Sequence, residues 1–386
     1  MAIPRAYLDH NASAPLRPAA RAAMLAAMDA SANPSSVHAE GRAARRIVEQ
    51  ARAAVAALAG ASADHVVFTS GATEAASLLL TPDWRMGRAP LAVSRLYVAA
   101  SDHPCILGGG RFGPGQVERI PVDGEGVMDV EALAAALAQH DRGAGLPMVA
   151  THVANNESGV IQSCAAIAAA TKAAGGVLVL DAVQAAGRIP LDIAELSADF
   201  LILSSHKIGG PQGAGAIVGA ADLMMPQPLV RGGGQERGHR AGTENLPAIA
   251  GFGAAARAAH EGRDSMGSVA SLRDAIEAAI LDLEPHAEFF GRSAARLPNT
   301  SFFALPGLKA ETAQIAFDLS GVALSAGSAC SSGKVGPSHV LKAMGKGGDA
   351  SGLRVSIGPE TGEADVALFR AALAQILARR DRTKAA

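Results

Sequence analysis

An alternation of short apolar runs and helical patterns between about residues 60 and 220 most constrains the fold of this chain. Runs at 66–68, 148–153 and 201–203 are too short for helices and read as buried strands, with helical segments between them. This order predicts an α/β fold with a mainly parallel sheet covered on both faces. Ligands bind such sheets outside the carboxyl ends of the strands, so the residues that follow the strands are candidates for a site.

The second part of the chain has a different pattern. The chain has 386 residues, enough for two or three domains, and 49% hydrophobic against 18% charged residues allow a large core. After residue 261, helices alternate with short strands in a pattern typical of a smaller α+β domain. We therefore expect a large domain over 15–260 and a small domain made of 1–14 and 261–386.

Charge and cysteine content exclude several classes of function. The formal net charge is -2 and no sustained basic run occurs, so nucleic acid is not an expected partner. No apolar signal segment and no span of 18 apolar residues occur, so we expect a cytoplasmic protein with no membrane partner. Cys105, Cys164 and Cys330 lack the spacing of metal ligands, which argues against a zinc site and a disulfide framework.

The strand at 201–203 leads directly into Ser204, His206 and Lys207, and then into a glycine-rich loop. A lysine sheltered at the end of a buried strand can have a lowered pKa, and its neutral amine can condense with an aldehyde. The neighbouring hydroxyl and imidazole groups suit a phosphate. Together they suggest pyridoxal phosphate (PLP) held as a Schiff base, although a solvated loop lysine is the alternative.

Other strand ends carry groups that complete such a site. Thr73 opens a helix after the sharp turn at Gly71, and a helix N-terminus binds anions. His103 follows a strand and could stack on a ring or move protons, or be purely structural. Asp181 could hold a pyridinium nitrogen or cap a helix, and Gln184 could donate to the phenolic oxygen. The segment 81–90, with the only tryptophan, is expected to be a surface excursion.

Three later segments supply the remaining candidates. Arg354, in LRVSIG, suits bidentate binding of a carboxylate, or is a surface arginine on an edge strand. The basic loop RGGGQERGHRAGTEN ends at Thr243 and could bind an anion in its own or a neighbouring subunit, or be simply solvated. Cys330 lies among small residues that favour an exposed loop. Its thiolate could attack a substrate sulfur and become a persulfide, or it is an incidental thiol.

Taken together, these segments resemble cysteine desulfurases of the NifS/IscS type in the class V aminotransferase fold family. The matching strings run in order through the chain: YLDHNASAP, NPSSVHAEGR, VFTSGATEA, DHPC, HVANNESGV, DAVQAAG, SSHKIGGPQGAGA, GGGQERGHRAGTEN, GSACSSG and LRVSIG. The resemblance implies a type I PLP-dependent transferase fold with a seven-stranded, mainly parallel sheet. It also implies a homodimer that converts L-cysteine to L-alanine and leaves sulfur on Cys330 for an iron–sulfur scaffold protein or another acceptor.

The resemblance also assigns residues to roles, position by position. It implies that catalysis uses Lys207, Cys330 and His103. The cofactor would be held by Ala72, Thr73, His103, Asp181, Gln184, Ser204, His206, Lys207 and, from the other subunit, Thr243. The substrate carboxylate would be bound by Asn156 and Arg354. Selenocysteine lyase, another class V PLP lyase or aminotransferase, and a non-catalytic sulfur-relay scaffold are the alternative functions.

Overall fold

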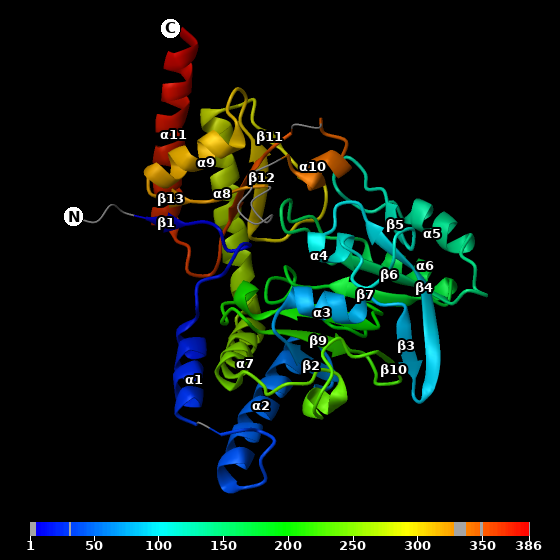
Figure 1. The fold of residues 1–386 in the computed structure, drawn as a ribbon. Coiled ribbons are helices and arrows are strands. Elements are labelled where there is room, and N and C mark those ends of the chain that lie inside the picture. Colours follow the sequence, from blue (N-terminus) through cyan, green and yellow to red (C-terminus); the bar gives the residue numbers. More distant parts are fainter. Residues whose placement is uncertain (1–4, 31, 328–336, 348–349, 386) are drawn as a thin grey trace.

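The computed structural model describes residues 5–30, 32–327, 337–347 and 350–385. Figure 1 shows a large sheet with its helices at the right and bottom, and a smaller sheet with its own helices at the upper left. Both chain termini lie on the side of the smaller sheet (Figure 1). Across the described ranges, no helix is both long and apolar enough to cross a membrane.

The large sheet confirms the mainly parallel arrangement. Within the described residues its strands are β2 (Val66–Thr69), β3 (Asp83–Met86), β4 (Ala89–Ala99), β5 (Val117–Ile120), β6 (Leu146–His152), β7 (Val177–Asp181), β8 (Phe200–Ser204), β9 (Gly215–Gly219) and β10 (Met224–Pro226). The order is β10-β3-β4-β6-β7-β8-β9-β2, and β5 also pairs with β4. Neighbours from β5 to β8 run parallel, whereas β9 is antiparallel to both β8 and β2. The expected seven strands are those from β5 to β2, and β3 and β10 extend them.

The segment 81–90 is largely exposed, as expected, but it forms a regular hairpin and its tryptophan is buried. β3 forms an antiparallel hairpin with the first half of β4. The Trp84 side chain is only 1% exposed and packs against Phe200, with ring centroids 5.3 Å apart. A tryptophan between polar residues gives no local sign of the distant strand on which it packs.

Helices cover both faces of this sheet because its central strands are apolar on both sides. In β7, Leu178 and Leu180 face one core, and Val177 and Val179 face the other. The helices of this part are α1 (Pro18–Asp29), α2 (Ala39–Leu58), α3 (Ala72–Leu79), α4 (Pro104–Leu107), α5 (Val130–Ala138), α6 (Cys164–Ala173) and α7 (Leu246–Glu261). Short 3-10 turns are η1 (Ala63–His65), η2 (Ser205–Lys207), η3 (Gln235–Gly238) and η4 (Arg263–Ser265).

The smaller part has a core of its own. Its antiparallel sheet has the order β11 (Glu288–Phe289), β12 (Thr300–Ala304), β15 (Leu353–Ser356), β14 (Ser325–Ala326). The short strand β1 (Ala6–Tyr7) pairs with β13 (Val322–Ala323), and the helices are α8 (Met266–Leu283), α9 (Ala310–Leu319), α10 (His339–Ala343) and α11 (Glu363–Ala385). Leu8 and Phe369, from opposite ends of the chain, share this core. The separate cores favour a boundary near residue 260, and the division into two domains stays a prediction.

Candidate active site

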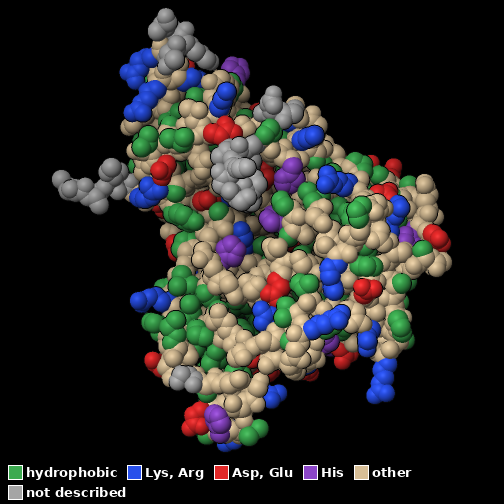
Figure 2. Space-filling view, in the orientation of Figure 1, with side chains coloured by type: hydrophobic (Ala, Val, Ile, Leu, Met, Phe, Trp, Pro, Cys, Tyr) green, Lys and Arg blue, Asp and Glu red, His purple; other side chains and the backbone are tan. Residues whose placement is uncertain are grey.

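The carboxyl ends of β6, β7 and β8 meet the N-terminus of α3 around one cavity of about 550 Å³. This volume lies within the roughly 300–1,000 Å³ of small-molecule sites. The predicted site residues that line it are Ala72, Thr73, His103, Asn156, Asp181, Gln184, Ser204, His206 and Lys207. Histidine side chains gather near the middle of the face shown in Figure 2. The parallel topology therefore brings together groups that lie up to 135 positions apart, between Ala72 and Lys207.

Lys207 ends the short turn η2 that follows β8. Its Nζ donates to the backbone oxygens of Asn11 and Ala12, at 2.7 and 2.9 Å. These carbonyls belong to the segment after β1, so the extreme N-terminal region takes part in holding the amine. The amine is half-buried and lines the cavity, and it is not a solvated loop lysine.

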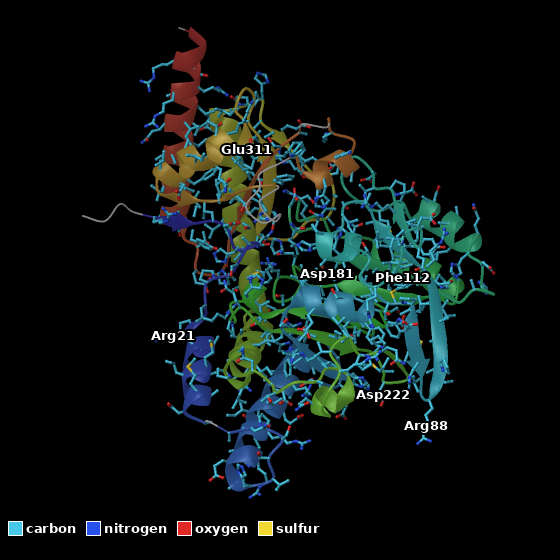
Figure 3. The ribbon with its side chains drawn as sticks, viewed as in Figure 1. Arg21, Arg88, Phe112, Asp181, Asp222 and Glu311 are labelled. Atoms are coloured by element: carbon cyan, nitrogen blue, oxygen red, sulfur yellow. The ribbon has the colours of Figure 1, made fainter. Side chains whose placement is uncertain are left out.

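Asp181 ends β7 near the middle of the molecule (Figure 3). Its side chain is buried, and Oδ1 accepts a hydrogen bond from the Val183 N–H at 3.0 Å. Burial raises the pKa of this carboxyl to about 6, because the charged form is deprived of water. Turns rather than a helix follow it, so the alternative of a helix cap is wrong. A carboxylate in this position gains stability from any cationic partner in the cavity.

Gln184 lies one turn beyond Asp181 with its amide held at both ends. Its Nε2 donates to the Asn11 backbone oxygen at 3.1 Å. Its Oε1 accepts from Arg188 Nη1 at 2.6 Å. Burial lowers the pKa of Arg188 to about 9. The contacts with Asn11 and Arg188 thus set the orientation of the Gln184 amide.

The N-terminus of α3 forms the opposite wall. Its first residue follows Gly71, which offers no side-chain cap, so the first N–H groups of the helix are available to an anion. Ser204 and His206 line the same cavity. Burial, with a contribution from Lys207, lowers the pKa of His206 to about 4, so its imidazole is neutral at pH 7. Neutral donors around a helix N-terminus suit a phosphate.

Glu74 and Arg240 form an ion pair at this wall that sequence reasoning missed. Arg240 Nε lies 2.9 Å from Glu74 Oε1, and the Ser70 N–H donates to Oε2 at 2.8 Å. Burial opposes the charge of Glu74, but the hydrogen bonds from Arg240 and Ser70 lower its pKa. No local pattern joins residues 166 positions apart. The pair connects the basic loop to the first turn of α3.

His103 lies after the turn that follows β4, where it caps the short helix α4. Its Nδ1 accepts from the Cys105 N–H at 3.2 Å and lies 3.0 Å from Cys105 Sγ. Burial and the charge of Lys207 lower the pKa of His103 to about 4. Cys105 also lines the cavity.

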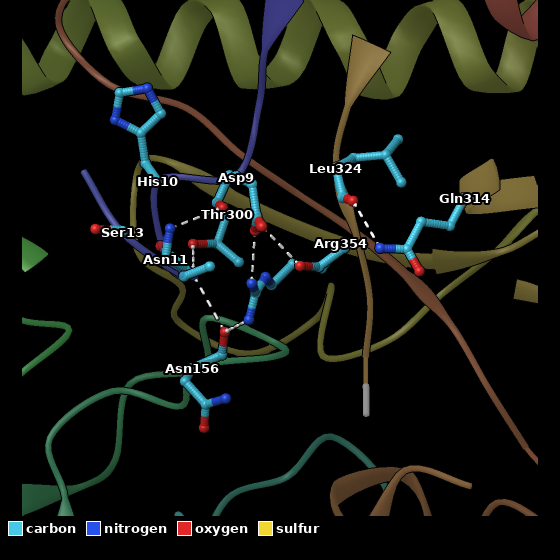
Figure 4. Close-up of polar contacts among 12 residues, drawn as sticks. Asp9, His10, Asn11, Ser13, Asn156, Thr300, Gln314, Leu324 and Arg354 are labelled. Atoms are coloured by element: carbon cyan, nitrogen blue, oxygen red, sulfur yellow. Dashed lines mark hydrogen bonds and ion pairs between the residues drawn. The ribbon is translucent and has the colours of Figure 1, made fainter. Parts of the chain in front are cut away.

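Arg354 lies in β15, whose neighbours are β12 and β14, and its guanidinium contacts Asn156 (Figure 4). Its side chain is 1% exposed, so the alternative of a surface arginine is wrong. Nη2 donates to Asp9 Oδ1 at 2.7 Å and Nη1 to the Asn156 backbone oxygen at 2.9 Å. Arg354 is not among the residues that line the cavity, whereas Asn156 is.

Among the described residues predicted for the site, Thr243 and Arg354 do not line the cavity. Thr243 is exposed and does not line it. The prediction that it reaches the site of another subunit stays a prediction. Cys330 lies outside the described residues.

The donor set fits PLP. Lys207 offers an amine, Asp181 a buried carboxylate, and α3 a helix N-terminus with hydroxyl and imidazole donors beside it, all around one cavity. These are the groups that an aldehyde, a pyridinium nitrogen and a phosphate require.

Comparison with known proteins agrees with this chemistry. The family model described as aminotransferase class-V matches residues 6–369. A cysteine desulfurase of Cereibacter sphaeroides is 41% identical over 350 residues, which cover 88% of this chain and 87% of the relative. A solved NifS-like protein from Rickettsia africae ESF-5 has a TM-score of 0.86 and 33% identity, covering 97% of this chain and 99% of that one.

A solved structure of SspA in complex with cysteine has a TM-score of 0.73 and 25% identity. It covers 92% of this chain and 100% of that one. The family and its cysteine desulfurases generally depend on PLP. The family match extends over most of the chain, and the chain therefore belongs to the class-V aminotransferase family, in which its curated relatives are cysteine desulfurases.

Proposed function

We propose that this protein is a PLP-dependent cysteine desulfurase, which converts L-cysteine to L-alanine and leaves the sulfur on Cys330. The observation that carries the proposal is the shared cavity of Lys207, Asp181 and the α3 N-terminus. The desulfurase relatives and the cysteine bound in the SspA structure support the choice of substrate.

The residues around the cavity divide the task of holding PLP. Lys207 would supply the amine for the aldehyde, Asp181 the negative charge at the pyridine nitrogen, and Gln184 a contact to the phenolic oxygen. The phosphate would be held by Ala72, Thr73, Ser204 and His206. When bound, PLP supplies an electron-withdrawing ring that accepts electrons from the substrate α-carbon.

The substrate would be held and activated by a second set of groups. Asn156 and Arg354 would hold its carboxylate, and His103 would move protons beside the ring. The Cys330 thiolate would attack the substrate sulfur. An S–S bond forms as the C–S bond breaks with its electrons passing to carbon, which takes up a proton to give alanine.

The remaining parts of the proposal concern the surroundings of the enzyme. We propose a cytoplasmic homodimer in which Thr243 completes the phosphate site of the partner. The exposure of Thr243 in the single chain is compatible with this role. The persulfide would pass to an iron–sulfur scaffold protein or to another sulfur acceptor.

One experiment tests the proposed reaction. PLP-loaded protein is incubated with L-cysteine, alanine is measured, and the tryptic peptides are analysed by mass spectrometry without reduction. We expect alanine together with one added sulfur atom on the peptide that contains Cys330. Cys330→Ala should lose activity and keep the absorbance of bound cofactor, whereas Cys164→Ala, at a buried core position, should keep both.

Three results would contradict the proposal. Alanine without sulfur on the Cys330 peptide would exclude the persulfide route. Full activity of Cys330→Ala on selenocysteine, but not on cysteine, would favour a selenocysteine lyase instead. A protein that binds no PLP at all would favour a non-catalytic sulfur-relay role.

A further inference from the structure

We infer that Cys105 is a positioning residue for His103: its backbone N–H and its thiol both donate to Nδ1, which holds the imidazole in the tautomer with its proton on Nε2. The inference concerns a residue for which the proposed reaction has no use. It rests on the proposed function only in the role that it gives His103.

The geometry alone decides the tautomer. The Cys105 N–H lies 3.2 Å from His103 Nδ1, and Cys105 Sγ lies 3.0 Å from the same nitrogen. A backbone N–H can only donate, so Nδ1 has to present its lone pair. With no proton on Nδ1, the thiol S–H must also be a donor. A neutral imidazole with a lone pair on Nδ1 carries its proton on Nε2.

The surroundings keep both partners in these protonation states. Burial, with the negative charges of Asp181 and Asp102, raises the pKa of the Cys105 thiol, so it keeps its proton. Burial is the largest cause that lowers the pKa of His103, and the positive charges of Lys207 and His339 lower it further. Cys105 is therefore a hydrogen-bond donor and not a nucleophile, although it lines the same cavity.

This arrangement determines what His103 can offer to a bound molecule. In the described part of the chain, Nδ1 makes the hydrogen bonds of this imidazole. Nε2–H is then the donor that His103 presents, and a proton can be added at Nδ1 only if the contact with the Cys105 N–H is given up and the thiol turns from donor to weak acceptor. A hydrogen bond donated to Nδ1 stabilises the neutral imidazole over the protonated one. Cys105 therefore lowers the pKa of His103 further.

The test measures the titration of His103 directly. We would record ¹H–¹⁵N spectra of PLP-loaded protein labelled with [¹⁵N]histidine across pH, and assign His103 from its loss in His103→Gln. In the unmodified chain, we expect the Nε2–H tautomer at pH 7. Cys105→Ala should raise the pKa of His103 by roughly 0.5–1 pH unit, since one donor to Nδ1 is lost.

A matched pair of variants separates this role from packing. Cys105→Ser restores a donor and should return the pKa to the value of the unmodified chain, while Cys164→Ala should leave it unchanged. Equal titration in Cys105→Ala and the unmodified chain would overturn the inference, as would a Cys105→Ser variant that behaves like Cys105→Ala. The titration is carried out without the substrate L-cysteine, so its outcome does not depend on whether the protein is a desulfurase.

Discussion

At the scale of single residues, the buried carboxyl of Glu157 shows how burial controls protonation next to this site. Glu157 directly follows Asn156 and is 1% exposed. The Ser338 hydroxyl donates to its Oε2 at 2.6 Å, and His339 Nδ1 lies 4.0 Å from Oε1. Burial nonetheless raises the pKa of this carboxyl from 4.5 to about 7, against the lowering effects of Ser338 and Arg354. The folded chain therefore prefers Glu157 in its protonated form.

This preference predicts how stability changes with pH. Between about pH 4.5 and 7 the folded state binds more protons at Glu157 than the unfolded state, so its contribution to stability falls as pH rises. The cost of the buried charge is absent below this window and reaches up to about 3 kcal/mol above it.

The matching variant is Glu157→Gln, which can still accept from Ser338 but cannot ionise. In urea unfolding we expect it to match the unmodified protein at pH 4 and to be more stable at pH 8. Glu195→Gln, at an exposed position, is the control and should show no such difference. A stability difference for Glu157→Gln that is the same at both pH values would refute the assignment.

At the level of elements, the site depends on how closely β9 approaches the turn before α3. Gly215 opens β9 and pairs with Ser204 and Thr69. A Cβ added at Gly215 would lie 2.6 Å from Gly71 Cα and 2.9 Å from the Leu203 backbone oxygen. Neither neighbour is the end of a flexible side chain, so the backbone would have to move. The turn before α3, which we propose to hold the phosphate, can lie this close to β9 because Gly215 has no side chain.

Gly215→Ala should therefore weaken the cofactor site. We expect PLP affinity to fall about 10-fold or more and the free energy of unfolding to fall by about 1–3 kcal/mol, because the added methyl displaces the α3 turn. Equilibrium dialysis of PLP and urea unfolding measure the two effects. Gly267→Ala, where a Cβ meets nothing within 4 Å, should leave PLP affinity unchanged. Unaltered affinity in Gly215→Ala would contradict this account.

For the whole molecule, Asn11 joins Thr300 of the small sheet to Asn156 beyond the end of β6 (Figure 4). Its side chain donates to Thr300 Oγ1 and the Asn156 backbone oxygen and accepts from Asn299 Nδ2, at 2.9, 3.2 and 3.1 Å. Its backbone oxygen accepts from Lys207 Nζ. Residues far apart in the chain thus meet at one buried amide.

Asn11→Ala removes the side-chain contacts but keeps the carbonyl that holds Lys207. We expect a loss of about 3 kcal/mol in urea unfolding, since polar groups of Asn299 and Thr300 lose buried partners. Asn33→Ala, at an exposed position, is the control and should stay close to the unmodified protein. Equal stability of the two variants would show that the network does not join the two parts.

Local sequence was enough to predict the elements and the groups at the strand ends. The helix α1 begins at Pro18, a residue suited to the first turn of a helix, and Asp129 caps α5 by accepting a hydrogen bond from the Ala132 N–H. Apolar periodicity involves residues that are close together in the chain, so it can be recognised from the sequence alone.

The sequence by itself determined the sheet and the convergence of Asp181, Asn156 and Lys207, since parallel topology places strand ends at one edge. Only the tertiary structure decided which side chains face each other across distant segments: Glu74 with Arg240, Asp9 with Arg354, and the burial of Trp84. Even His103 and Cys105, two positions apart, needed the turn geometry to share one nitrogen. Hydrogen bonds depend on direction and on ångström distances, which residue type and spacing do not encode.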